Sequence, residues 1–181
     1  GITAMNSVSI MTGNEKMQTY FSYANTTAKG IIDSNKLQKH NLTLRETANF
    51  FNERLKLDGN ANLMTQTIKN SPSSGGYYLN PLVNVYGFPR GMDMAPYRDS
   101  FETYDTDRNM NLQNWYVTNE DGTISEWDQN PYWIKNRVTN NNKRYRAMAA
   151  LTASVEATEW LTIQARGNVD YVSDKFENKM Y

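Results

Sequence analysis

Cysteine is absent from this chain of 181 residues, and histidine occurs once, at His40. The lack of cysteine excludes a disulfide scaffold, a thiolate zinc site and a cysteine nucleophile. One histidine cannot form a histidine-rich metal cluster by itself. Lys and Arg together number 19, as do Asp and Glu, so the formal net charge is zero. This balance disfavours a protein that holds nucleic acid on a basic surface.

Long apolar runs are also missing. No stretch of about 18 consecutive apolar residues occurs, so the sequence contains no candidate transmembrane helix. A membrane-spanning strand places only half of its side chains in lipid, so it looks polar on average and stays possible. The chain starts GITAMNSV, without the charged-then-apolar pattern of a signal peptide. We therefore expect either that a leader has been removed or that the chain is a piece of a longer protein.

Proline is confined to the middle of the chain. All five prolines and three of the four tryptophans lie between residues 70 and 142. Because proline cannot donate a hydrogen bond to a sheet ladder, strand interiors exclude it. The sequence thus predicts two strand-rich flanks, 1–69 and 143–181, separated by a long irregular segment over 70–142.

The flanks alternate between apolar and polar residues. In WLTIQARGNVDYV (160–172), Leu161, Ile163 and Val169 occupy one face, while Gln164 and Arg166 occupy the other. Period-two alternation is typical of a β-strand with one apolar and one polar face. The same pattern predicts about four strands in the first flank and two in the second, over 7–13, 17–25, 40–51, 54–68, 145–157 and 160–172.

Strand length and connection length favour a transmembrane barrel over a soluble sheet. Several predicted strands have about a dozen residues, against about 9–11 for a tilted membrane-crossing strand and about 5–6 in globular proteins. Short turns at 14–16, 52–53 and 157–159 alternate with long connections at 26–39 and 70–142, as in outer-membrane barrels. We therefore expect an all-β antiparallel fold with polar side chains facing a lumen, namely Arg45, Lys56, Asp58, Arg146, Gln164, Arg166, Asn168 and Asp170.

About six strands cannot close such a barrel, since eight is the smallest common number. The barrel prediction therefore implies that this chain is one sector of a larger wall. The alternative is a secreted antiparallel β-sandwich that binds carbohydrate through an aromatic loop.

Several segments resemble the SusC/RagA group of TonB-dependent outer-membrane transporters. NSVSIMTGNEKMQTYFSYANTTAKGII is similar to that family's early barrel strands, and HNLTLRETANFFNERLKLDGNANL to the next hairpin. NPLVNVYGFPRG, YDTDRNMNLQNW and NPYWIKNR resemble the family's long loop, and WLTIQARGNVDY the strand after it. The resemblance runs in family order over nearly the whole chain.

The resemblance implies a barrel of about 22 strands with a plugged lumen. It implies import of glycans or oligopeptides across the outer membrane of Bacteroidetes-type bacteria, without a cofactor. The implied partners are the remainder of the barrel and its plug, a SusD-like surface lipoprotein that caps the extracellular face, membrane lipid, and TonB acting through the plug. We expect no plug domain within this chain and no nucleic-acid partner.

The long middle segment holds the candidates for contact with a ligand or a lipoprotein lid. They are mostly aromatic residues, which offer large contact areas at low entropic cost: Tyr77, Tyr78, Arg90, Trp115, Trp127, Tyr132 and Trp133. Internal packing or lid contact is favoured over ligand stacking, because a loop of about 70 residues needs packing of its own. FPRG (88–91) reads as a turn with a solvated arginine.

Two acidic patterns in this segment are expected to be turns. DTDRN (105–109) begins like a calcium loop, but Met110 and Tyr116 stand where glycine and glutamate are needed. NEDGTI (119–124) reads as a hairpin tip with Asp121-Gly122 as its turn. Glu120, Glu126 and Asp128 read as solvated residues, and no hydrolase or phosphate-binding motif is present. The sequence predicts no catalytic or metal site and no enzymatic activity.

Overall fold

The computed structural model describes residues 1–73, 75–76, 79–125 and 127–181. The chain divides into two compact units. The first, the sheet unit, comprises residues 1–32, 36–68 and 142–176. The second, the loop unit, comprises residues 33–35, 69–141 and 177–181. The two acidic turn segments, 105–109 and 119–124, belong to the loop unit. The predicted long strands lie in the sheet unit.

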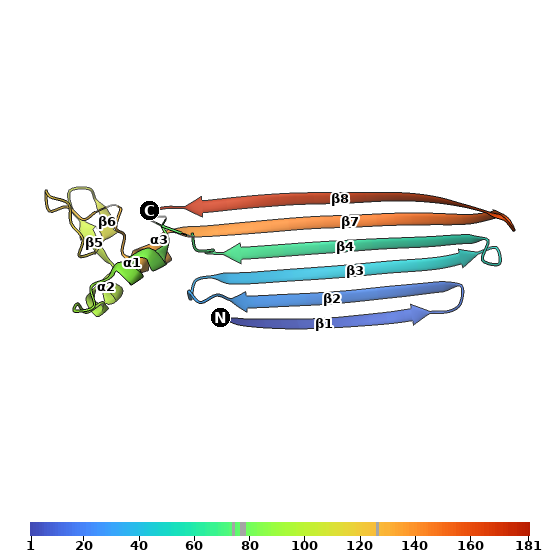
Figure 1. The fold of residues 1–181 in the computed structure, drawn as a ribbon, viewed down its shortest axis with the longest axis horizontal. Coiled ribbons are helices and arrows are strands. Elements are labelled where there is room, and N and C mark those ends of the chain that lie inside the picture. The colour runs from blue at the N-terminus through green and yellow to red at the C-terminus, as the bar shows by residue number, and fades with distance from the viewer. Residues whose placement is uncertain (74, 77–78, 126) are drawn as a thin grey trace. The chain divides into compact units, whose positions relative to one another are not determined.

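Six strands form one sheet in the order β1-β2-β3-β4-β7-β8 (Figure 1). Neighbouring strands run antiparallel where a short turn joins them, as β1 with β2 and β2 with β3. Among the described residues β1 and β8 are not neighbours, so the sheet is open. The all-β prediction with six long strands is confirmed. The bounds are β1 (Ile2–Gly13), β2 (Met17–Lys29), β3 (Lys36–Phe50), β4 (Leu55–Lys69), β7 (Thr139–Thr158) and β8 (Leu161–Lys179).

Local chemistry explains the turns that join these strands. Gly13 adopts φ +144°, and a Cβ there would lie 2.2 Å from the carbonyl oxygen of Met17, so the close hairpin requires glycine. The side chain of Asn14 accepts hydrogen bonds from the amides of Lys16 and Met17 at 2.9 and 3.0 Å. Three consecutive residues with positive φ, 51–53, reverse the chain between β3 and β4.

The predicted long connection over 26–39 was wrong. β2 continues to Lys29 and β3 begins at Lys36, so only residues 30–35 join them. Thr26 and Thr27 pair with Lys39 and Gln38 in the ladder. Backbone groups pair in a ladder whatever the polarity of the side chains, so a strand continues where its apolar alternation stops. The same cause extends β7 and β8 beyond their predicted ends.

The loop unit holds three short helices and a two-stranded sheet. They are α1 (Pro81–Gly87), α2 (Ala95–Asp99), β5 (Glu102–Asp105), β6 (Met110–Gln113) and α3 (Pro131–Arg137). Each helix has proline in its first turn, where the missing N–H costs nothing. Asn80 and Asn130 cap α1 and α3 by accepting from the amides of Leu82 and Tyr132. Within the described residues, no helix has the length and apolar content needed to span a membrane.

The buried core of the chain lies in the loop unit. Trp115, Trp133 and Ile134 are 3–5% exposed. The Trp115 ring packs against Phe88 at 5.5 Å and against Tyr97 at 5.3 Å between ring centroids. In the six long strands, all of which lie in the described part of the chain, Ala48 is the one buried residue.

A buried asparagine ties the loop unit together. Asn130 is 0% exposed, and its amide group donates to the carbonyl oxygens of Tyr97 and Asn114 at 2.8 and 2.7 Å. Its backbone N–H donates to the side chain of Gln113 at 2.7 Å, and Gln113 in turn donates to the carbonyl of Ser125 at 2.8 Å. This network joins segments that are far apart in the sequence. The side-chain amides of Asn130 and Gln113 are thus paired, whereas the buried indole nitrogen of Trp115 has no hydrogen-bond partner among the described residues.

Candidate functional site

The two faces of the six-stranded sheet differ in chemistry. Directly opposed residues of neighbouring strands point to the same face, so the ladder register identifies each face. Ile10, Phe21 and Leu44 lie opposite one another on β1, β2 and β3. By alternation along each strand, Tyr20 and Arg45, also directly opposed, point to the other face. We call these the apolar face and the polar face.

Large side chains of the apolar face stay exposed. Ile2 is 76% exposed, Val169 67% and Phe21 37%, while Leu42 and Leu57 are half-buried. Ile163, Leu63 and Leu151 also lie on this face and are at least half exposed. Soluble proteins rarely leave a contiguous apolar patch of this kind uncovered. The apolar face is therefore a candidate contact surface of the sheet unit.

On β1, β2 and β3, polar side chains lie on the apolar face at both ends of its apolar stretch. Towards the β1–β2 turn, Thr19 donates a hydrogen bond to the Glu46 carboxylate at 2.6 Å. In the other direction, Asn25 and His40 are directly opposed. The hydroxyl of Tyr23 lies 2.7 Å from His40 Nδ1. The one histidine of the chain is thus contacted by a cross-strand tyrosine and asparagine.

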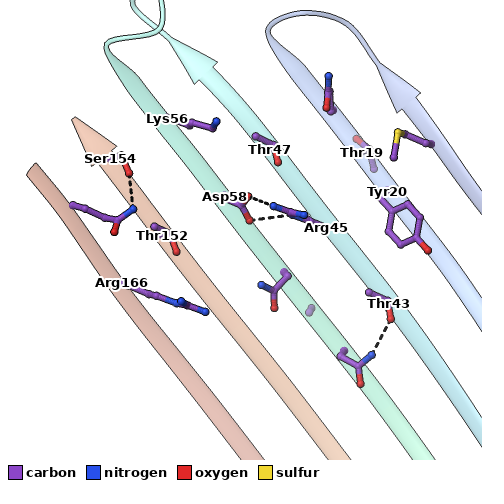
Figure 2. A pocket seen from close by; sticks show the side chains of 16 residues that line it. Thr19, Tyr20, Thr43, Arg45, Thr47, Lys56, Asp58, Thr152, Ser154 and Arg166 are labelled. Carbon is purple, nitrogen blue, oxygen red and sulfur yellow. Dashed lines mark hydrogen bonds and ion pairs between the residues drawn. The ribbon is translucent and has the colours of Figure 1, made fainter. Parts of the chain in front are cut away.

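A broad groove of about 1060 Å³ lies on the polar face (Figure 2). All six long strands contribute to its lining, so it belongs to the sheet unit alone. The charged residues of the groove are Arg45, Lys56, Asp58 and Arg166; its other lining residues include the hydroxyls and amides of Tyr20, Thr43, Thr47, Asn60, Asn62, Thr152, Ser154 and Gln164. A polar lining of this extent suits a hydrated surface.

Cross-strand ion pairs rigidify the polar face. Arg45 on β3 donates two hydrogen bonds to Asp58 on β4, at 2.5 and 3.3 Å (Figure 2). Arg146 on β7 makes the same forked contact with Asp170 on β8, at 2.6 and 2.9 Å. Planar guanidinium groups match carboxylates in this two-bond geometry, so each pair also fixes the relative position of its two side chains.

The structure brings the predicted lumen-facing residues to one face. Arg45, Lys56, Asp58, Gln164 and Arg166 line the groove. Of the remaining three, Arg146 and Asp170 form the pair just described, and Asn168 shares their face by alternation on β8.

Sequence reasoning missed one further pair on this face. Arg144 donates to the two carboxylate oxygens of Asp174 at 2.7 and 2.8 Å. The signal was available, because both residues continue the even-numbered polar alternation of β7 and β8. It was overlooked because the strands were predicted to start at residue 145 and to end at residue 172.

The predicted contact residues of the loop unit occupy different environments. Trp115 and Trp133 are buried, in agreement with internal packing. Trp127 is 75% exposed, Tyr132 is half-buried and Arg90 is exposed. Arg90 follows Pro89, whose carbonyl accepts from the amide of Met92 at 3.1 Å, so FPRG is a turn. Tyr77 and Tyr78 lie outside the described residues, as does Glu126.

A second hollow of about 650 Å³ lies within the loop unit. Trp127, Trp133 and Tyr181 line it together with Met110, Leu112 and Ile124. The ring of Tyr181 packs edge-on against Trp133 at 5.5 Å, and the Arg137 guanidinium lies 4.7 Å from the centre of the Tyr181 ring. Two of the predicted contact tryptophans are thus brought to one hollow, whose lining also includes polar residues such as Asp105 and Arg108, while Trp115 packs elsewhere. Tyr181 was missed because nothing in its local sequence marks it.

Both acidic patterns of the loop unit form turns. Asp105 accepts from the amides of Asp107 and Arg108, each at 2.9 Å, and closes the β5–β6 hairpin. Asn119 and Thr123 flank the predicted hairpin tip, where the Asn119 amide donates to the Thr123 carbonyl at 2.7 Å. Gly122 has φ +80° there. Among the described residues, no group of three or more acidic, histidine or cysteine side chains is placed to hold a metal ion.

Titratable groups of the loop unit respond to local partners. A hydrogen bond from Lys135, together with its charge, lowers the pKa of Asp33; the two groups are 2.7 Å apart. Arg98 lowers the pKa of Asp99 in the same way. Burial raises the pKa of Tyr116 within the aromatic cluster. These shifts accompany local hydrogen bonds, ion pairs and burial.

No protein-family model matches the chain, and no curated protein matches its sequence. The functional conclusion therefore rests on the two faces of the sheet and on the hollows described above.

Proposed function

We propose that this chain is a wall segment of an outer-membrane nutrient importer of the SusC/RagA type, with the apolar face against lipid and the polar face towards a hydrated lumen. The observation that carries the proposal is the sheet itself. Six long strands share one exposed apolar face and one polar face braced by ion pairs. Water is a poor solvent for the first face, and lipid is a poor solvent for the second.

The dimensions of the apolar face agree with a bilayer. On β8 the apolar residues run from Leu161 to Tyr171. Ten residue steps correspond to about 34 Å along an antiparallel strand. A tilt of about 45° reduces this to about 24 Å across the membrane, close to the apolar band of about 25 Å of such barrels.

The open edges of the sheet imply missing neighbours. An unpaired strand edge is not tolerated in lipid, because its backbone N–H and C=O groups have no water to bind. The outer edges of β1 and β8 would therefore pair with further strands of the same barrel. In this proposal the loop unit lies on the extracellular side beneath a SusD-like lipoprotein, and a plug in the rest of the barrel couples transport to TonB.

Neighbouring residues of β8 provide a matched test. Because the chain has no cysteine, Val169→Cys on the apolar face and Asn168→Cys on the polar face each introduce one labelling site. We expect an environment-sensitive dye at residue 169 to be quenched by spin-labelled lipid, and the same dye at residue 168 to be quenched by aqueous iodide. The measurement is made on the whole chain in detergent micelles and in lipid vesicles.

Circular dichroism of each labelled protein controls for altered folding. Equal accessibility of the two dyes to iodide would overturn the membrane proposal. A monomer that unfolds cooperatively in buffer without detergent or lipid would also contradict it.

The hollow of the loop unit supports a second candidate function, binding of a sugar ring. Trp127 is 75% exposed beside this hollow, and an exposed aromatic face stacks readily on the apolar face of a sugar. In the six long strands themselves, a sandwich is not formed, since all six lie in one sheet. Trp127→Ala tests this function by titration with maltotriose. An affinity unchanged from the parent chain would remove the sugar-binding candidate.

A further inference from the structure

The groove of the polar face carries unbalanced positive charge. Its lining contains three cationic side chains, Arg45, Lys56 and Arg166, and one carboxylate, Asp58. Arg45 occupies both oxygens of that carboxylate. Among the described residues, neither Lys56 nor Arg166 has a carboxylate within ion-pair distance, and both are exposed. Among the described residues, the groove therefore presents two cations that form no ion pair, although Lys56 interacts with the charge of Asp58 from beyond ion-pair distance.

Elsewhere on the polar face, arginines of β7 form ion pairs with aspartates of β8. Arg144 and Arg146 lie on β7, and each is matched by an aspartate on β8. Arg166 lies on β8 itself. The groove-lining residues of the neighbouring strand β7 are Thr152 and Ser154, which are uncharged. The side chain of Arg166 extends from β8 over β7 (Figure 2). Arg166 therefore has no carboxylate partner among the groove-lining residues of β7, and its side chain is directed across the groove.

The spacing of the two cations suits a ligand with repeated charges. Lys56 lies on β4 and Arg166 on β8, with β7 between them. Two strand spacings correspond to about 9.6 Å across the strands, and the two residues are also displaced from each other along the strand direction (Figure 2). The groove lining on β4 and β7 also includes hydroxyl and amide groups, among them Asn60 and Thr152. They can accept and donate hydrogen bonds along a chain of polar units.

We propose that the groove binds a carboxylate-bearing oligomer, with one carboxylate at Arg166 and another at Lys56. The inference rests on the proposed transport function, because it names the class of substrate that the lumen wall favours. Arg166 offers a planar fork for one carboxylate, and Lys56 offers a compact point charge for the second. A neutral oligomer would leave both cations without a partner. The positive potential of the groove also attracts anions before contact.

Binding of defined probes to the whole chain tests this inference. The probes are trigalacturonate and an acetylated triglutamate amide, and their neutral counterparts are the methyl ester of trigalacturonate and the triglutamine peptide. We expect either carboxylate probe to bind more tightly than its neutral counterpart, with an affinity that falls as salt rises from low to physiological ionic strength. The two carboxylate probes distinguish a sugar backbone from a peptide backbone.

Matched charge removals locate the site. Lys56→Gln and Arg166→Gln should each weaken binding of the carboxylate probe about threefold, and the double variant about tenfold, in line with exposed ion pairs. Lys39→Gln is the control, because Lys39 lies on the polar face of β3 but does not line the groove. Circular dichroism verifies that each variant retains its strands.

Equal binding of charged and neutral probes by the parent chain would overturn the inference without any variant. A loss at Lys39→Gln as large as that at Lys56→Gln would also overturn it, because the effect would then reflect net charge rather than the groove. The dye experiment at residues 168 and 169 keeps the two proposals separate. Lipid insertion without charge preference contradicts the groove alone, and charge preference without lipid insertion contradicts the membrane wall alone.

Discussion

The sheet unit and the loop unit differ in how many side chains they bury. The loop unit has 73 of its residues in one continuous segment, 69–141, and it buries tryptophan, isoleucine and asparagine side chains. The sheet unit has the long, regular strands, yet it buries one alanine. The segment that reads as a loop in the sequence carries the packed core, and the segments that read as regular structure carry exposed apolar surface.

This difference separates two sources of stability. The loop unit contains tightly packed rings and paired buried amides, so it holds its own core. The sheet unit has backbone ladders and surface ion pairs, but it lacks a second layer among the described residues. Hydrophobic burial is the dominant favourable term in folding. The sheet unit has little of this term within itself, and in the membrane proposal lipid contact supplies it.

Among the substitutions that test this difference, removal of a buried aromatic ring should cause the largest loss of stability. Trp115→Ala would leave a cavity among Phe88, Tyr97 and Tyr116 and should lower the stability of the loop unit by about 3–5 kcal/mol. Urea unfolding followed by near-ultraviolet circular dichroism measures the change. Trp160→Ala is the matched control in the sheet unit, where Trp160 is 82% exposed, and it should change stability by about 0.5 kcal/mol or less. Equal losses would show that the two units do not differ in burial.

A smaller loss is expected when the buried amide network is cut. Asn130→Ala removes the cap of α3 and leaves the carbonyl oxygens of Tyr97 and Asn114 without their donor. The loop unit should lose about 2–3 kcal/mol, from the cap and from orphaned buried groups. Asn136→Ala in the same helix is the control, because Asn136 is exposed and donates to one carbonyl. If both substitutions cost the same, the network is not a core element.

The smallest effect concerns the exposed ion pair between Asp33 and Lys135. Lys135 lowers the pKa of Asp33 in the folded protein, so the folded state binds the proton more weakly than the unfolded state. The contribution is present above the unfolded pKa of about 3.9 and is lost as the pH falls through the lower folded pKa. A carbon-13 NMR titration of the Asp33 carboxyl should show its pKa returning towards the ordinary value in Lys135→Met. An unchanged titration curve would mean that the contact is not formed in solution.

Part of the candidate site was predictable because it depends on periodicity alone. A strand places alternate side chains on opposite faces whatever it packs against, so Arg45, Asp58 and Arg166 could be assigned to one face from sequence. The forked pairing of Arg45 with Asp58 could not, because it depends on the register between β3 and β4. The loop unit offered a local signal that was overlooked. An asparagine directly before a proline, at residues 80–81 and 130–131, is typical of a capped helix start.

The sequence by itself determined the strands, their two faces and the short turns, since alternation, glycine and asparagine act over a few neighbouring residues. The tertiary structure decided where strands end, which carboxylate each arginine binds and which side chains are buried. Asn130 shows the physical reason. A polar side chain can be fully buried when distant carbonyl groups satisfy it, and no local pattern specifies those partners. The exposed apolar face is a second example, because tertiary structure alone shows that the sheet unit has no second layer of its own over this face.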